Sequence, residues 1–170
     1  QMRELVQVGK VNLLNPLGQE LSQMRSSLLF SLLEVVSFNQ NRQRSDLKIY
    51  EFGKVYRTTE DGHQEDRKLA LALCGNATKE AWNSTDDKAD FYHLKGSLMS
   101  LFESLGINNI SEQASELDLF SAGIELKSRK KSIAQFGIVD ATILNKFSID
   151  QEVVYAEIDF TTLYELAFSK

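Results

Sequence analysis

Arg57 is the residue of this chain with the clearest potential for chemistry. It ends an apolar stretch, residues 47–57, whose composition is typical of a strand. A guanidinium at the end of a strand offers a planar fork of donors that suits a phosphate or a carboxylate. We expect its neighbours to include Glu51, Lys54 and a loop over residues 58–66. What Arg57 does therefore depends on the groups that stand around it.

The other reactive residue types predict no catalytic site. His63 and His93 are the only histidines, and neither has a cysteine near it, so we expect no metal site. Cys74 is the only cysteine and falls within an apolar run, which favours a small buried hydrophobe over a nucleophile. A single cysteine forms no intrachain disulfide, and this predicts a reducing compartment, the cytoplasm. No glycine-rich phosphate loop occurs in the sequence.

Length and composition indicate an ordinary globular protein. The 170 residues are 42% hydrophobic and 25% charged, and we expect one domain over residues 1–170. The net charge of -5 argues against a general binder of nucleic acid or of membrane surfaces. No apolar run approaches the roughly 20 residues that span a bilayer. The start at Gln1 resembles neither a signal peptide nor a natural initiation, so we expect a piece of a longer chain.

Hydrophobic periodicity predicts an α+β fold. Apolar residues recur at helical spacing in four segments, one of them short, and alternate or cluster at strand spacing in seven others. The order favours one mostly antiparallel sheet flanked by helices. The predicted helices span about residues 20–40, 90–105, 140–146 and 161 onward, and the predicted strands span 8–14, 47–57, 67–75, 114–120, 123–128, 132–139 and 153–160.

Three glycines have predicted roles. Gly53 interrupts the strand 47–57, which indicates a bulge or a close approach of another segment. Gly96 lies inside a predicted helix, where it costs about 1 kcal/mol relative to alanine, and close packing against the sheet is the expected compensation. Gly106 follows the same helix and is expected to end it.

Exposed basic residues allow two interpretations. Arg129, Lys130 and Lys131 lie in a predicted turn, and a solvated hairpin tip is favoured over a contact with RNA phosphates. Arg42 and Arg44 suit the C-terminal end of a helix and are the other candidates for RNA contact. Trp82, in a polar segment, is expected to fold its loop onto the core or to cover a subunit contact.

Four stretches, in order, resemble the synthetase-like core domain in the β subunit of bacterial phenylalanyl-tRNA synthetases. The resemblance implies the fold of class II aminoacyl-tRNA synthetase cores. It also implies an α2β2 assembly in which the α subunit carries the aminoacylation site and acts on tRNA-Phe. ATP and Mg²⁺ serve the whole enzyme, and no cofactor is expected in this chain. The matching stretches are residues 15–29, 47–57, 90–98, and 136–140 with 155–159.

The same resemblance implies that the site has lost its chemistry. Arg57 falls on the arginine of the second class II motif, but Thr59 stands where an acid is expected two residues later. Residues 147–169 contain no lysine or arginine to take the place of the third motif's arginine. We therefore interpret Arg57 as the relic of an ATP site, with a structural pairing to Glu51 or a loop carboxylate. Carboxylates that would repel a triphosphate if they faced the pocket are Asp150, Glu152, Glu157, Asp159 and Glu165.

Residues 15–42 resemble the first class II motif, which makes the subunit contact. The helix 20–40 is apolar on two sides, and this predicts a second packing partner, which we take to be the α subunit. A helix buried wholly within this domain is the alternative. Two other functions stay open: a tRNA-binding module and a free-standing ATP-dependent enzyme. The predicted interface residues are Leu21, Met24, Phe30, Val35 and Phe38.

Overall fold

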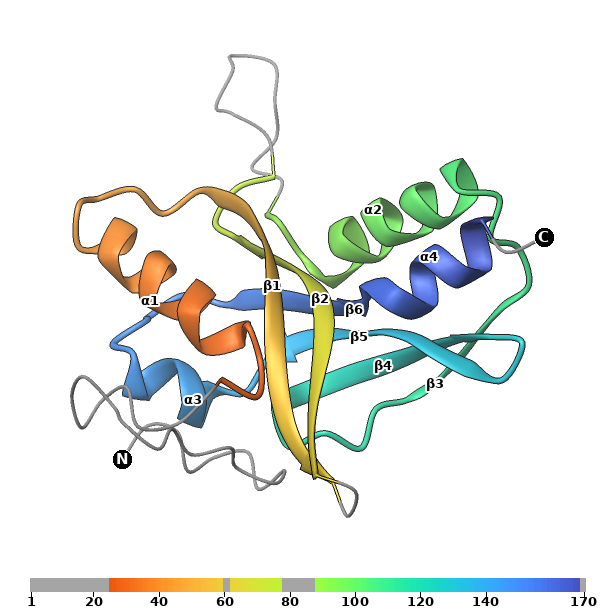
Figure 1. The fold of residues 1–170 in the computed structure, drawn as a ribbon. Helices are drawn as coiled ribbons and strands as arrows, with labels where there is room; N and C mark the ends of the chain where they lie inside the picture. The colour runs from red at the N-terminus through yellow and green to blue at the C-terminus, as the bar shows by residue number, and fades with distance from the viewer. Residues whose placement is uncertain (1–24, 60–61, 78–87, 169–170) are drawn as a thin grey trace, which may run out of the picture.

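The computed structural model describes residues 25–59, 62–77 and 88–168, which form one antiparallel sheet with helices on both faces (Figure 1). The sheet has six strands in the order β1-β2-β6-β5-β4-β3, and every neighbouring pair is antiparallel. The predicted α+β class is confirmed. The elements are α1 (Leu29–Gln40), β1 (Leu47–Thr59), β2 (Gly62–Cys74), α2 (Phe91–Ser104), β3 (Ile110–Ala114), β4 (Phe120–Ser128), β5 (Lys131–Val139), α3 (Ala141–Lys146), β6 (Val153–Asp159) and α4 (Phe160–Phe168).

The sheet separates two hydrophobic cores. On β6, Tyr155 faces the core beneath α1 and α3, while Val154 and Ala156 face the core beneath α2 and α4. This follows from the strand geometry, because successive side chains point to opposite faces. β6 lies between β2 and β5 and is buried on both faces, as its nearly continuous apolar sequence requires.

Three predicted elements are wrong in their boundaries. β2 begins at Gly62 rather than at residue 67, so most of the predicted loop over residues 58–66 belongs to the β1–β2 hairpin. α1 begins at Leu29 rather than near residue 20, because residues 25–28 make side-chain contacts to the sheet in place of helical hydrogen bonds. The strand predicted over 114–120 is also wrong, since β3 ends at Ala114 and a loop carries Leu119 into the core. Because polar and apolar residues alternate before this buried leucine in the sequence, the segment has the hydrophobic pattern of a strand. The predicted strand 8–14 lies outside the described residues.

The glycine predictions met different outcomes. β1 pairs with β2 without a register break, so Gly53 marks a close approach and not a bulge. A Cβ on Gly53 would meet the Arg25 guanidinium and would lie 2.7 Å from Leu28 Cδ2. Gly96 has nothing within 4 Å of its Cβ position, so the predicted close packing there is wrong. Gly106 ends α2 at φ +69°, and Ile107 N–H reaches back to Phe102 O at 2.9 Å.

Candidate functional site: a pocket beside Arg57

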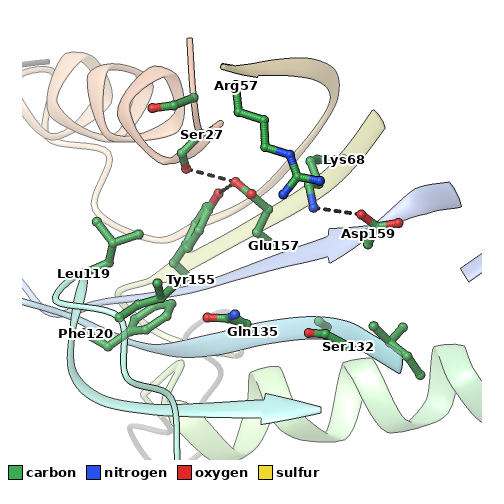
Figure 2. Close-up of a pocket in the computed structure, with 14 residues that line it drawn as sticks. Ser27, Arg57, Lys68, Leu119, Phe120, Ser132, Gln135, Tyr155, Glu157 and Asp159 are labelled. Carbon is green, nitrogen blue, oxygen red and sulfur yellow. Dashed lines mark hydrogen bonds and ion pairs between the residues drawn. The ribbon is translucent and has the colours of Figure 1, made fainter. Parts of the chain in front are cut away.

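A pocket of about 340 Å³ lies between the start of α1, the sheet and the loop before β4 (Figure 2). One end is apolar and is formed by leucines and aromatic rings, whereas the other end is charged. Its size lies within the range of small-molecule sites. The charged residues come from β1, β2 and β6, because three strands of the sheet present them to the same opening. They are Arg57, Lys68, Glu157 and Asp159.

Arg57 lies on this pocket but is already paired. Its Nε lies 3.0 Å from Oδ2 of Asp66, which belongs to β2 and not to the predicted loop. Glu51, the other expected partner, binds Arg25 at 2.6 Å and accepts a hydrogen bond from Ser31 at 2.7 Å. The expected pairing of Arg57 with Glu51 is therefore wrong, and the carboxylate from the following segment is the partner.

Lys68, the second cation of the pocket, is paired as well. Its Nζ lies 2.9 Å from Oδ2 of Asp159. Burial of the Asp159 carboxyl opposes its ionisation, but the Thr162 amide and the Lys68 ammonium outweigh burial and lower the pKa of Asp159. Both cations of the pocket are thus neutralised by carboxylates on neighbouring strands of the sheet.

Glu157 is used to hold the start of α1. Its Oε2 accepts hydrogen bonds from Ser27 Oγ at 2.9 Å and from Tyr155 Oη at 2.6 Å (Figure 2). It also accepts one from the Leu28 backbone N–H at 3.1 Å. Tyr155 is buried, and burial together with the Glu157 charge raises the pKa of its hydroxyl. We call Ser27, Leu28, Tyr155 and Glu157 the Glu157 cluster. It fixes the N-terminal end of α1 to the central strand.

The pocket does not fit a triphosphate with magnesium. Of the five carboxylates predicted to repel it, Glu157 and Asp159 line the pocket, while Asp150, Glu152 and Glu165 do not. α4, the helix after β6, contains no lysine or arginine. Within residues 25–59, 62–77 and 88–168, no three potential metal ligands form a cluster. A nucleotide would therefore meet two carboxylates and two cations that already have partners.

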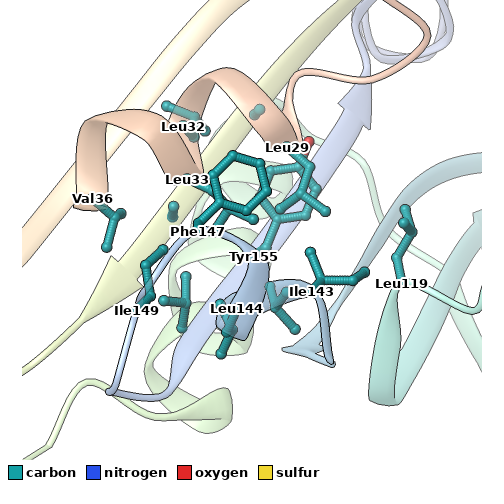
Figure 3. Packing of buried hydrophobic residues seen from close by; sticks show 14 of the residues in the cluster. Leu29, Leu32, Leu33, Val36, Leu119, Ile143, Leu144, Phe147, Ile149 and Tyr155 are labelled. Carbon is teal, nitrogen blue, oxygen red and sulfur yellow. The ribbon is translucent and has the colours of Figure 1, made fainter. Parts of the chain in front are cut away.

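The predicted interface helix has a narrower open face than its sequence indicated. Leu29, Leu33 and Val36 of α1 point into the core (Figure 3). Phe30 belongs to this side too, because its ring stacks on Phe147 with centroids 6.1 Å apart. The predicted role of Phe30 in a free apolar face is therefore not supported by its position.

Val35 and Phe38 remain exposed on α1, with 43% and 57% of their surface accessible. The Arg42 guanidinium lies 3.5 Å above the Phe38 ring, which fixes both side chains on the outer face. Leu21 and Met24, the other two predicted interface residues, lie outside the described residues. The open apolar surface of α1 in the described residues thus consists of one aliphatic and one aromatic side chain.

The basic residues predicted for RNA contact are not brought together. Arg42 and Arg44 follow α1 at one end of the molecule. The β4–β5 turn, with Arg129 and Lys130, lies at the opposite end (Figure 1). Lys131 pairs with Glu165 of α4 at 2.8 Å. The five basic residues therefore form no common surface.

Exposed aromatic residues were missed by the sequence analysis. Tyr50 and Phe52 project from β1, which is an edge strand, and Tyr164 and Phe168 project from α4. Two patterns in the sequence indicate these aromatic residues. The strand 47–57 is apolar in both phases of its alternation, and aromatic residues recur every four positions along α4.

The remaining single residues behave as structural groups. Cys74 is buried, and burial raises the pKa of its thiol to about 11, so it is no nucleophile at neutral pH. Asp90 caps α2 and accepts from the Tyr92 and His93 amides. His63 is exposed in β2, and Trp82 lies outside the described residues.

An antiparallel six-stranded sheet with helices on both faces, and a charged pocket on one of them, defines a domain of the class II aminoacyl-tRNA synthetase type. Two structures of pyrrolysyl-tRNA synthetase from Desulfitobacterium hafniense share this fold. They superpose with TM-scores of 0.68 and 0.65 over 92% and 89% of this chain and 52% of each of those chains. Both are 16% identical to it, so the likeness shows the fold alone.

Residues 3–160 match the family described as "Phenylalanyl tRNA synthetase beta chain CLM domain", and the chain belongs to this family. This domain is a synthetase-like, non-catalytic part of the β chain. Relatives named phenylalanine–tRNA ligase beta subunit are 33% identical in Bacteroides fragilis, 35% in Syntrophotalea carbinolica and 32% in Thermotoga maritima. The alignments cover 90%, 90% and 96% of this chain. The chain spans about a fifth of the length of these relatives, 20% to 21%.

Proposed function

We propose that this chain supports the assembly of a phenylalanine–tRNA ligase by presenting α1 to the catalytic α subunit. Family membership supports the setting, an α2β2 enzyme that uses ATP and Mg²⁺ to charge tRNA-Phe. The observation that carries the proposal is on α1 itself. One face of the helix is fully buried, while Val35 and Phe38 lie open on the other. A helix with apolar side chains on two sides suits two partners.

The paired charges of the pocket favour a role of this chain in assembly over a role in catalysis. Groups that stabilise the charge of a transferring phosphoryl group contribute about 3 to 4 kcal/mol each in enzymes. Here Arg57 and Lys68 are held by Asp66 and Asp159 instead. Glu157 contributes a further negative charge and binds the start of α1. The pocket residues therefore serve the position of the helix that we assign to the interface.

Association with the α subunit tests the proposal. Phe38→Asp places a charge on the open face of α1 and should weaken association at least tenfold, as for a truncated interface aromatic. The midpoint of urea unfolding should hardly change, because the Phe38 ring is exposed. Tyr92→Asp is the matched control, since Tyr92 is also an exposed aromatic residue, on α2, with 74% of its surface accessible. Equal association of the Phe38→Asp variant and the parent chain, measured by analytical ultracentrifugation, would reject the proposal.

A free-standing enzyme is the less favoured alternative. Isothermal titration of the chain with ATP and phenylalanine should give no binding heat, because the cations of the pocket are paired and α4 supplies none. Saturable binding of both ligands would favour an enzyme. No helix in the described part of the chain is long and apolar enough to span a membrane. The cytoplasmic location stays a prediction.

A further inference from the structure

We propose that the β4–β5 turn and the outer face of α4 form a binding surface for single-stranded RNA, in which Arg129 and Lys130 contact phosphates and Tyr164 and Phe168 stack on bases. The β4–β5 turn lies at the opposite end of the molecule from α1 (Figure 1). The proposal therefore does not depend on the assembly role of α1.

The turn holds two cations in a defined position. Ser128 pairs with Lys131, so Arg129 and Lys130 form a two-residue loop, and both have positive φ, 49° and 66°. Asparagine and glycine adopt this conformation more readily than long side chains do. Backbone strain of this kind is frequent at functional sites. The hairpin thus presents two exposed basic side chains where smaller residues would fit more easily.

The electrostatics of this end favour an anion. Each carboxylate on β3, β4 and α4 is neutralised by a lysine: Glu112 by Lys95, Glu125 by Lys127 and Glu165 by Lys131. β5 carries no carboxylate. Within the described parts of the chain, no ion pair involves Arg129 or Lys130. Arg129 and Lys130 therefore keep their positive charges without an ion-pair partner among the described residues, on a chain whose net charge is -5.

Two exposed aromatic rings lie on α4, the helix that the base of the turn contacts. The ion pair between Lys131 and Glu165, 2.8 Å long, holds the base of the turn against α4. Tyr164 precedes Glu165, and Phe168 lies one turn further along the helix. The two rings are 57% and 65% exposed, with centroids 5.0 Å apart.

Proteins bind single-stranded RNA by combining basic side chains, which contact the phosphate backbone, with exposed aromatic rings, on which the bases stack. A duplex hides its bases and leaves the two rings without a partner. An acidic protein surface would use the cations but not the rings. The geometry therefore favours an unpaired RNA segment over both.

Fluorescence anisotropy with a labelled single-stranded adenine octamer tests the surface. Two phosphate contacts predict a slope of about -1.4 in the logarithm of affinity against the logarithm of salt concentration. The double variant Arg129→Gln with Lys130→Gln should bring this slope close to zero. Phe168→Ala should weaken binding at least fivefold, because stacking on one base contributes about that much or more.

Arg42→Gln with Arg44→Gln is the matched control, because it removes the same charge at the other end of the chain. This control should leave affinity and slope unchanged. Circular dichroism should show that all variants keep the parent fold. The proposal is overturned if the parent chain binds no octamer at 50 mM salt, or if both double variants lose affinity equally. Tighter binding of an RNA duplex or of polyglutamate than of the octamer would overturn it as well.

Discussion

The pocket and the outer face of α1 are two regions of one synthetase-like domain with opposite characters. In the pocket, the four charged residues all contact partners within the same chain. On the outer face of α1, the apolar side chains of Val35 and Phe38 are exposed, and the charged guanidinium of Arg42 lies over the Phe38 ring. Groups that satisfy one another stabilise the fold, whereas groups left open are available to a partner. Variants in the pocket should therefore change stability, and variants on the face should change association.

The largest effect is expected for Glu157→Ala. The change removes the acceptor of three hydrogen bonds, one of them from the hydroxyl of the buried Tyr155. We expect a loss of about 3 kcal/mol in the free energy of unfolding, measured with urea. Glu152→Ala is the control, because Glu152 is exposed and does not line the pocket. A loss of less than about 0.5 kcal/mol would mean that the Glu157 cluster does not hold α1.

A smaller effect is expected for Gly53→Ala. The new methyl group would displace Leu28 and Arg25, so unfolding should become easier by about 1 to 3 kcal/mol. Gly96→Ala is the matched substitution, since it enters open space inside a helix and should stabilise the chain by up to about 1 kcal/mol. If both variants shift thermal unfolding in the same direction, the close approach at Gly53 does not constrain the chain.

The smallest effect is expected from pH. The pKa of Asp159 is lowered in the folded chain, so its contribution is complete above the unfolded pKa of about 3.9 and is lost as the pH falls through the folded value. Asp159→Asn should flatten the stability curve below about pH 4. Urea unfolding at several pH values measures it. An unchanged slope in the variant would show that the ion pair with Lys68 does not stabilise the fold.

The sequence predicted elements whose signals are local. Helix α2 is an example, because its apolar spacing runs along the helix itself, and Asp90 and Gly106 stand directly at its two ends. The start of α1 was missed, since it is set by Glu157, which is distant in sequence but adjacent in space. The same limit applies to Arg57: Glu51 shares its face of β1 but lies six residues, about 20 Å, away along the strand, whereas Asp66 lies on the neighbouring strand β2.

Exposure was the least predictable property. Phe30 and Phe38 are equally apolar on one helix, yet only Phe30 finds a ring, Phe147, to pack against. Tyr50 and Phe52 looked like core residues of an apolar strand, but the position of β1 at the edge of the sheet exposes them. The order of strands in a sheet depends on the whole chain, and no local sequence pattern predicts it.

The segment around Arg25 has a consequence for aggregation. Its carbonyl accepts the N–H of Tyr56, and its Nε donates to the carbonyl of Lys54, both at 2.9 Å. These are backbone groups on the side of β1 that β2 leaves open. An unprotected edge of this kind invites pairing with the edge of another molecule. By occupying it with its own backbone and side chain, the protein blocks this part of its edge strand from growing into an intermolecular sheet.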